Sequence, residues 1–204
     1  MNIQNSPHRS RIGIFGGTFN PPHIGHLIVA EEVRENFALD RIVFIPSARP
    51  PHKTHSPVID PIHRFQMIQL ATRENPYFEV SNIEIRRPGT SYTIDTVKSF
   101  RNTYGPDGEI FFIMGGDSIF EIDTWKDREE IFKHCTIIVT SRPGFHLSRV
   151  EDPLKAKILL SEVSSIGISS TGIRQRIQEG KSIRYLVPRD VETYIREQEL
   201  YRSH

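Results

Sequence analysis

The sequence contains a single cysteine, Cys135, among its 204 residues, so no internal disulfide can form. A chain without disulfides is typical of a reducing compartment, and we therefore expect a cytoplasmic protein. Cys135 precedes the apolar run 136–139, which favours a buried thiol over a reactive one. No apolar run approaches the roughly 18 residues of a membrane span, and Met1–Arg11 lacks the apolar centre of a signal peptide. We therefore expect no membrane partner.

The sequence also lacks an excess of charge of either sign. Lysine and arginine total 26 and aspartate and glutamate total 25, which leaves a formal net charge of +1. This balance argues against a large basic surface, and hence against nucleic acid as a partner. Hydrophobic residues make up 37% and charged residues 25%, values typical of a globular protein. The length fits one full domain, or one domain with a small appendage.

Short apolar segments alternate with helical patterns along the chain. We predict strands at 11–15, 41–46, 78–85, 109–114, 136–140 and 157–160. We predict helices at 24–37, 62–75, 93–104, 128–132, 170–178 and 188–200. This order predicts a doubly wound, mainly parallel, Rossmann-like α/β sheet with helices on both faces and a small C-terminal helical appendage. The predicted units are a poorly ordered lead at 1–10, a core at 11–165 and a helical subdomain at 166–204.

Loops that follow the predicted strands are the candidate ligand-binding segments. In open α/β sheets, ligands bind beyond the carboxyl ends of the strands. This rule selects 16–26, 115–118 and 141–144, each of which follows a strand. The proline-rich segment 47–61 is also predicted to be a loop, and loops of this length are often functional.

The most informative of these loops is Gly16–His26, which reads GGTFNPPHIGH. Its glycines follow Gly13 with a spacing that breaks the G-x-G-x-x-G dinucleotide fingerprint, and the chain has no G-x-x-x-x-G-K-[ST] loop. The sequence therefore excludes an ordinary Rossmann dehydrogenase and a P-loop enzyme. Glycine at a strand end lets the backbone approach a ligand, and the helix N-terminus that follows attracts anions. We predict a phosphate site here.

His23 and His26 fall three positions apart at the start of the helix, and hence on one face. The positive end of the helix dipole favours neutral imidazoles, each of which can still donate one N–H to a phosphate oxygen. A single histidine in such a position more often caps a helix or packs as a ring. Zinc would need a third ligand, but Glu31 lies farther along the helix and Cys135 lies in a buried strand. We therefore predict no metal ligands among the protein side chains.

A second anion site is predicted at Ile168–Arg174, which reads ISSTGIR. Ser169, Ser170 and Thr171 offer hydroxyls and backbone N–H groups at a helix start, and Arg174 lies one turn on. The alternative is an ordinary Ser/Thr cap beside a solvated arginine. Two helix N-termini suited to phosphate indicate a substrate with several phosphates, such as a nucleoside triphosphate.

Three further segments carry candidate groups. His52 and Lys53 could bring hydrogen-bonding and cationic groups onto the phosphates, although such a segment can also be a plain loop. Asp117 follows a strand, where aspartate commonly accepts ribose hydroxyls, or it simply forms a turn. Trp125, the only tryptophan, is a candidate stacking platform for an aromatic ring or a structural residue.

The sequence lacks the usual agents of covalent catalysis. It contains no Gly-x-Ser-x-Gly elbow, no reactive-cysteine signature and no closely spaced carboxylate pair. Displacement at phosphorus needs mainly positioning and charge stabilisation, which neutral histidines, Lys53, Arg174 and a Mg²⁺ carried in with the triphosphate would supply. An attacking phosphate monoester, whose second pKa is about 6, needs no general base.

These motifs also carry a family resemblance that covers nearly the whole chain from residue 11 onward. Gly16–His26 resembles the G-[GS]-[TS]-F-[DN]-P-x-H-x-G-H signature of the nucleotidyltransferase superfamily, and Ile168–Arg174 resembles its I-S-S-T-x-x-R partner. The closer resemblance is to the family of bacterial nicotinate-nucleotide adenylyltransferases. It is carried, in the family's order, by Pro50–Lys53, Ser91–Thr96, Gly116–Asp117, Trp125 and Arg142–Gly144.

The resemblance implies that ATP and nicotinate mononucleotide react to nicotinate adenine dinucleotide and pyrophosphate. The catalytic residues that it implies are His23, His26, Lys53 and Arg174. The ATP site that it implies comprises Gly16, Gly17, Thr18, Phe19, His23, His26, Gly115, Asp117, Ser169, Ser170, Thr171 and Arg174. The nicotinate-nucleotide site that it implies comprises His52, Lys53, Ser91, Tyr92, Thr93, Trp125, Lys126 and Arg142.

Two residues depart from the family pattern, and alternatives follow. Asn20 stands where aspartate is also common, and Lys126 follows Trp125 where an aromatic residue sometimes sits. Nicotinamide mononucleotide as acceptor, a phosphopantetheine adenylyltransferase, a non-catalytic nucleotide sensor and a metal-dependent hydrolase stay open as alternatives. The sequence also leaves open whether the protein forms a homo-oligomer.

Overall fold

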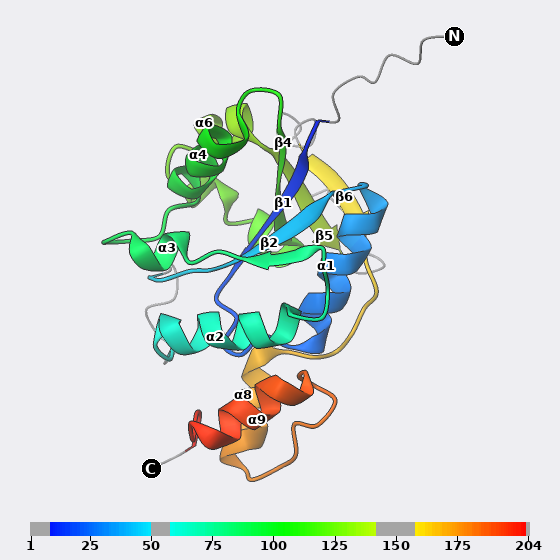
Figure 1. Cartoon of the computed structure of the whole chain (residues 1–204), viewed down its shortest axis with the longest axis vertical. Coiled ribbons are helices and arrows are strands. Elements are labelled where there is room, and N and C mark those ends of the chain that lie inside the picture. The colour runs from blue at the N-terminus through cyan, green and yellow to red at the C-terminus, as the bar shows by residue number, and fades with distance from the viewer. Residues whose placement is uncertain (1–8, 50–57, 142–157, 203–204) are drawn as a thin grey trace.

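Six parallel strands form the centre of the molecule. The computed structural model describes residues 9–49, 58–141 and 158–202. Within these residues the strand order is β3-β2-β1-β4-β5-β6 (Figure 1), and every neighbouring pair is parallel. The strands are β1 Arg11–Gly17, β2 Arg41–Pro46, β3 Phe78–Val80, β4 Glu109–Gly115, β5 Thr136–Ser141 and β6 Ile158–Glu162. The expected parallel, Rossmann-like α/β fold is confirmed.

Helices connect the strands and complete the C-terminal part of the chain. They are α1 Ile24–Asn36, α2 Pro61–Thr72, α3 Ile83–Arg86, α4 Thr93–Tyr104, α5 Gly116–Ile119, the short 3₁₀ helix η1 Ile122–Thr124, α6 Arg128–His134, α8 Ser170–Gln178 and α9 Arg189–Glu197. None of the helices in the described part of the chain is long and apolar enough to cross a membrane.

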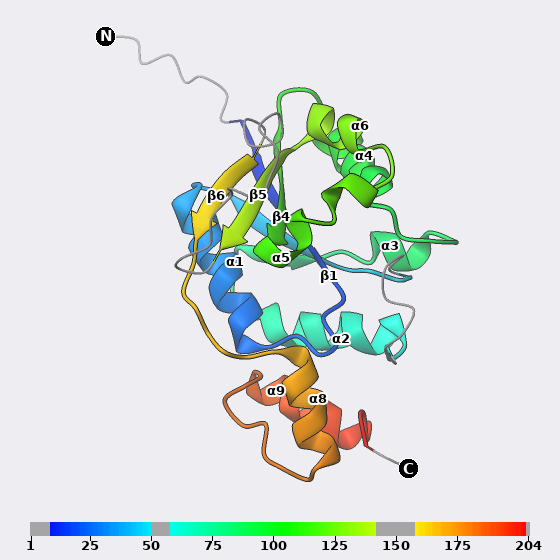
Figure 2. The same cartoon turned by 180° about the vertical axis from the view of Figure 1, so that it is seen from behind.

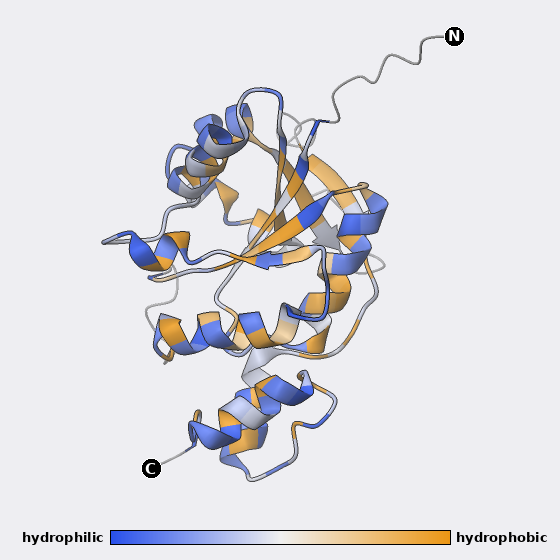
Figure 3. Cartoon of the chain, in the orientation of Figure 1, coloured by the Kyte–Doolittle hydropathy of each residue, from blue (hydrophilic) through white to orange (hydrophobic). Residues whose placement is uncertain are grey.

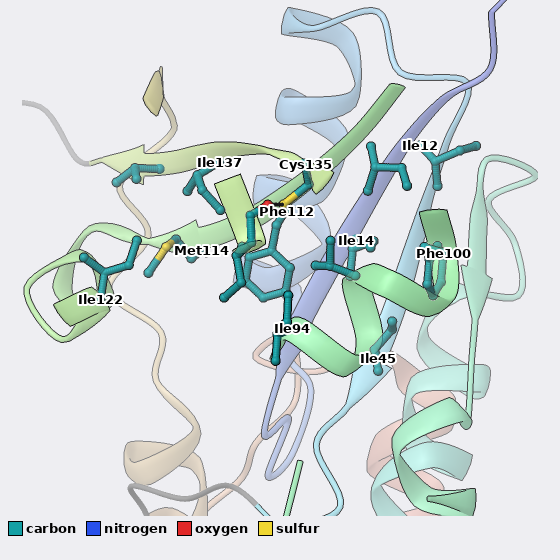
Figure 4. Close-up of a cluster of buried hydrophobic side chains, with 14 of the residues drawn as sticks. Ile12, Ile14, Ile45, Ile94, Phe100, Phe112, Met114, Ile122, Cys135 and Ile137 are labelled. Atoms are coloured by element: carbon teal, nitrogen blue, oxygen red, sulfur yellow. Dashed lines mark hydrogen bonds between the residues drawn. The ribbon is translucent and has the colours of Figure 1, made fainter. Parts of the chain in front are cut away.

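Both faces of the sheet are apolar. Successive strand residues point to opposite sides, and in these strands the residues on each side are mostly apolar. In β1, Ile12 and Ile14 join one buried cluster, and Phe15 joins the other. The first cluster (Figure 4) is covered by α4 and α6, which contribute Ile94 and Ile131 among other residues. The second is covered by α1 and α2. The strands therefore occur in the sequence as continuous apolar runs, and Figure 3 shows orange strands inside helices of mixed colour.

The chain reverses its direction of travel across the sheet between β1 and β4. From β1 it moves outward through β2 to β3, and it then returns to β4 and moves through β5 to β6. The connections on the two sides of this point diverge and leave a crevice at the carboxyl ends of β1 and β4, which is where ligands bind in doubly wound sheets.

The C-terminal helices α8 and α9 pack on α2 as a separate small layer (Figures 1 and 2). Met67 of α2 is fully buried between them, together with Ile173, Val191 and Ile195. The helical appendage expected at the C-terminus is therefore present. The domain limits that we set at residues 10 and 165 stay predictions.

The strand predicted at 78–85 is wrong beyond Val80. The Ser81 N–H still donates to the Phe44 carbonyl oxygen at 2.9 Å, but the Ser81 hydroxyl then accepts the Ile83 N–H at 3.3 Å. This local serine turn diverts the backbone into the helix α3. The alternating apolar pattern of Ile83 and Ile85 could not reveal it. Similarly, three of the four residues of the loop predicted at 115–118 belong to the helix α5 Gly116–Ile119.

Candidate active site

Two cavities open at the carboxyl ends of β1 and β4, and Gly115 lines both. The first has a volume of about 390 Å³ and the second about 360 Å³. Gly115 ends β4 directly beside the crevice, so the cavities are neighbouring halves of one site. We call them the acceptor-side cavity and the histidine-side cavity.

The acceptor-side cavity brings together segments that are far apart in the sequence. Of the residues singled out above, its wall contains Gly16, Gly17, Thr18, Ser91, Tyr92, Thr93, Gly115, Trp125 and Lys126. Residues 16–18 come from the end of β1 and the position after it, residues 91–93 lead into α4, and residues 125 and 126 follow η1. The structure thus places part of the expected ATP site directly against the expected nicotinate-nucleotide site.

An aromatic wall closes the acceptor-side cavity. The Trp125 ring packs edge-on against Phe112 of β4, with centroids 5.6 Å apart and an interplanar angle of 87°. The Lys126 ammonium lies over the Tyr92 ring, 4.6 Å from its centroid. An indole in the cavity wall offers ring surface for stacking, and a cation beside it favours a negatively charged ring substituent.

No side chain caps the N-terminus of α4 within the described residues, although the helix points its first turn at this cavity. Tyr92 occupies the cap position, and Thr93 begins the helix. The N–H groups of a helix start attract anions when no side chain satisfies them. The cavity therefore combines an aromatic face, an ammonium group and a helix N-terminus, a set that suits an aromatic carboxylate.

The histidine-side cavity is lined by both predicted histidines. His23 is the N-cap residue of α1 and His26 is the third residue of the helix. The His23 backbone N–H donates to Nδ1 of His26 at 3.1 Å, and the His26 N–H donates to the His23 carbonyl at 2.9 Å. Because Nδ1 of His26 accepts a hydrogen bond, its neutral ring carries the proton on Nε2. That N–H is a suitable donor to a phosphate oxygen.

Burial keeps the His23 ring neutral. Only 7% of His23 is exposed, and burial lowers the pKa of its imidazole to about 4. Its Nδ1 is buried with no hydrogen-bond partner among the described residues. Neutral imidazoles were expected here from the helix dipole, but the structure identifies desolvation as the cause for His23. An orphaned polar atom in a cavity wall is also a group that a ligand can satisfy.

Two glycines make room for aromatic rings in this region. A Cβ added to Gly17 would lie 2.8 Å from the Phe19 ring, and one added to Gly25 would lie 3.1 Å from Nδ1 of His23. Phe19 is buried beneath the turn and contacts the His26 ring edge-on, with centroids 5.1 Å apart. The glycines of the motif therefore permit the ring packing that holds His26 in place.

The start of α8 lies against the turn that precedes α1. Arg174 donates from Nη1 to the carbonyl of Asn20 at 2.9 Å, and the Ser170 hydroxyl donates to the carbonyl of Pro21 at 2.8 Å. Ile168, just before α8, lines the same cavity as His23. The two helix N-termini that the sequence marks as anion sites are therefore adjacent.

The hydroxyls of the second motif all have partners within the protein. Ser169 caps α8 by accepting the Gly172 N–H at 3.1 Å, and Thr171 accepts from Nη2 of Arg174 at 3.3 Å. The cap that we kept as an alternative is therefore present at Ser169. Backbone N–H groups and the guanidinium remain the main groups that this motif can offer to an anion.

Some predicted site residues lie outside the described residues, and others were missed. His52, Lys53, Arg142 and the side chain of Asp117 belong to the first group. Ser118 lines one cavity and lies in the segment 115–118 selected from the sequence, whereas other lining residues were not foreseen, among them Glu84 and Glu121 in one cavity and Thr140, Ser164 and Ile166 in the other. Thr140 lies near the end of β5 and Ser164 follows β6 by two residues, so a strand end was the available signal for these two. Glu84 was hidden within the strand wrongly predicted at 78–85.

A sequence model of the family described as cytidylyltransferase-like matches residues 14–176. A relative from Moorella thermoacetica, described as "Probable nicotinate-nucleotide adenylyltransferase", is 50% identical over 99% of this chain and 95% of its own. A relative from Thermus thermophilus with the same description is 46% identical over 94% of this chain and 100% of its own. The chain belongs to the nicotinate-nucleotide adenylyltransferase family. The superfamily signature inferred from Gly16–His26 and Ile168–Arg174 agrees with this membership.

Solved structures support the fold of this nicotinate-nucleotide adenylyltransferase family member. The Plasmodium falciparum nicotinic acid mononucleotide adenylyltransferase complexed with NaAD superimposes with a TM-score of 0.77. The match covers 95% of this chain and 98% of the other at 18% sequence identity. The arrangement of strands and helices is therefore shared despite extensive divergence in sequence.

Proposed function

We propose that this protein transfers the adenylyl group of ATP to nicotinate mononucleotide, producing nicotinate adenine dinucleotide and pyrophosphate for NAD biosynthesis. The observation that carries this proposal is the junction of the two cavities at Gly115. One cavity offers His23 and His26 at a helix N-terminus for a polyphosphate. The other offers an indole, an ammonium group and a second helix N-terminus for an aromatic carboxylate. Family membership supports the same reaction.

The reaction is a displacement at the α-phosphorus of ATP. A phosphate oxygen of the mononucleotide forms the new P–O bond as the bond to the bridging oxygen breaks, and pyrophosphate leaves with that electron pair. The attacking phosphate is largely ionised at neutral pH and gives up no proton, so no general base is required. The protein contributes positioning and stabilisation of the charge that develops on the phosphate oxygens.

Within this mechanism, His26 and Arg174 donate hydrogen bonds to the triphosphate, and the neutral His23 ring stacks on the His26 ring. Lys53 and His52 act on the phosphates, and Asp117 accepts the adenosine ribose hydroxyls, as the family resemblance implies. The Gly16–Phe19 turn, Gly115 and the Ser169–Thr171 backbone complete the proposed ATP site. A buried, neutral His23 avoids placing two charged imidazoles at one helix start, where the dipole opposes a positive charge.

On the acceptor side, the nicotinate ring stacks on Trp125, and its carboxylate meets the α4 N-terminus around Thr93. Ser91, Tyr92 and Arg142 complete this proposed site. The Lys126 ammonium lies over Tyr92 in the same cavity wall and carries a charge opposite to that of the carboxylate. This charge favours the acid over the amide mononucleotide, because the amide has no charge to attract.

Mg²⁺ enters this site on ATP in our proposal. The described residues contain no group of three or more His, Cys, Asp or Glu side chains that could hold a metal ion. The donor set at the histidines suits phosphate better than a metal, because only two imidazoles meet there. A divalent ion held by the triphosphate oxygens would offset their negative charge. A cytoplasmic location stays a prediction.

The test of this proposal is a rate measurement with two acceptors. The purified protein is incubated with Mg-ATP and either nicotinate or nicotinamide mononucleotide, and both pyrophosphate and dinucleotide are quantified. We expect turnover with both products in equal amounts and a preference for the acid. A preference for the amide would replace the proposed acceptor. Tight ATP binding by calorimetry without turnover on either acceptor would favour a nucleotide sensor and contradict the proposal.

A further inference from the structure

Arg64, on the first turn of α2, is a charged side chain with no solvent-exposed surface (0%). Its guanidinium donates to three backbone carbonyl oxygens. Nε donates to Ile59 at 3.1 Å, Nη1 to Thr18 at 2.8 Å and Nη2 to Ala48 at 3.4 Å. Arg64 therefore ties three separate backbone segments together.

This arrangement is costly for stability. Burial lowers the pKa of the Arg64 guanidinium, but an arginine pKa starts so high that the group stays charged. No carboxylate forms an ion pair with Arg64 among the described residues, although Asp60 and Glu84 act on it at longer range. A buried charge without a close counter-charge has a desolvation cost, which hydrogen bonds to backbone carbonyls offset. The same three hydrogen bonds also hold the segments that they join at a defined separation.

Two of the carbonyls that Arg64 holds belong to segments that border the acceptor-side cavity, and the Thr18 segment leads on to the histidines. Thr18 lies in the turn between β1 and α1, and Ala48 follows β2. The Ala48 N–H donates in turn to the Ser91 hydroxyl at 3.1 Å, in the acceptor-side wall. A continuous chain of hydrogen bonds therefore runs from Thr18 through Arg64 and Ala48 to Ser91.

A planar guanidinium is well suited to such a link. Its N–H groups diverge in a rigid fork, so the distance between the carbonyls that it bridges is fixed. Lysine could hold only a compact point charge in the same place, and an apolar side chain could hold neither carbonyl. Ser91 also lies near the buried Glu84, whose pKa burial raises and the Ser91 hydroxyl lowers.

We infer that Arg64 is a positioning residue that sets the distance and orientation between the Thr18 turn and the Ala48–Ser91 wall, and thereby aligns the two substrates for in-line attack. This inference rests on the proposed function. Arg64 is not among the residues that line either cavity, so its loss leaves the separate affinities largely intact. It disturbs the relative placement of the reacting phosphates, to which the rate is far more sensitive.

The experiment compares Arg64→Met and Arg64→Lys with two controls on or beside the same helix. Arg73→Met makes the same chemical change at an exposed arginine that pairs with Asp190. Ile68→Ala destabilises α2 from a buried position in the apolar cluster beneath the sheet, away from the Arg64 links. For every folded variant, we would measure kcat at saturating substrates, the Kd of each substrate alone by calorimetry, and the melting temperature.

We expect Arg64→Met to lower kcat on the order of 10²-fold while each separate Kd changes by less than about threefold, because a misplacement of about 1 Å costs a factor of this size. Arg64→Lys should fall between this variant and the wild type. The inference would be overturned if Arg64→Met had the same kcat as Ile68→Ala. It would also be overturned if Arg64→Met mainly lost affinity for one substrate. A wild-type protein without turnover would instead overturn the proposed function. Should Arg64→Met not fold, Arg64→Lys decides by the same kcat-against-Kd criterion.

Discussion

The imidazole of His23 stacks on the imidazole of His26, with ring centroids 3.6 Å apart and an interplanar angle of 24°. The two rings have different environments. His23 is buried, and its pKa lies near 4. Nδ1 of His26 accepts a hydrogen bond from the His23 backbone N–H, and both residues line the histidine-side cavity. In this pair, the neutral His23 ring packs against the His26 ring, and His26 is the residue that we expect to donate to phosphate. A charged His23 would repel a second charge on its neighbour and would lose solvation at the same time.

The first prediction concerns stability against pH. The pKa of His23 is about 4 in the folded protein and 6.5 in the reference state, so between these values the unfolded chain binds more protons. The free energy of unfolding should therefore rise with pH from about 4 to 6.5, by up to about 3 kcal/mol from this residue. His23→Gln removes that contribution, and urea unfolding across this range should give a flatter profile than the wild type. Parallel profiles for the two proteins would contradict the assignment.

The second prediction concerns catalysis by His26. His26→Ala should lower kcat by on the order of 10²–10³, as expected for the loss of one donor to the transition state, with a smaller effect on KM. Steady-state kinetics with both substrates varied measure this split. His63→Ala is the matched control, because His63 contacts Tyr194 in the C-terminal layer and lines neither cavity. A change confined to KM would mean that His26 serves binding alone.

The third prediction concerns the acceptor-side wall. Trp125→Ala should raise KM for nicotinate mononucleotide by about tenfold and leave KM for ATP nearly unchanged, since aromatic stacking contributes about 1 kcal/mol or somewhat more. Trp125→Phe keeps an aromatic face against Phe112 and should recover most of the loss. Equal effects on both substrates would place Trp125 outside the acceptor site.

The third prediction extends to the charge beside Trp125. Lys126→Met keeps a long side chain over Tyr92 but removes the ammonium. We expect the ratio of kcat/KM for the acid to that for the amide mononucleotide to fall severalfold, since an exposed charge pair contributes at most about 1 kcal/mol. High salt should lower the wild-type ratio in the same direction. A ratio that Lys126→Met leaves unchanged would assign the preference to the backbone of α4.

Local sequence patterns determined much of this fold. Apolar runs such as Arg41–Pro46 gave strands with the predicted limits, and α4 begins and ends where its pattern predicts. They failed where a short polar contact overrode the pattern, as at Ser81. The approach of the two anion motifs is marked by the hydrogen bond between Arg174 and the carbonyl of Asn20, which are separated by 154 residues. The family pattern implied that approach, but no local rule could locate the contact.

The sequence by itself determined the parallel α/β class, the histidine pair at a helix start and the family, because periodicity and motif spacing are local properties of the chain. Only the tertiary structure decided that burial keeps His23 neutral and that Arg64 links the Thr18 and Ala48 backbones. Burial and long-range hydrogen bonds depend on which segments meet when the core packs. An arginine in a helical segment has the same letter whether it is solvated on a surface or enclosed beneath an active site.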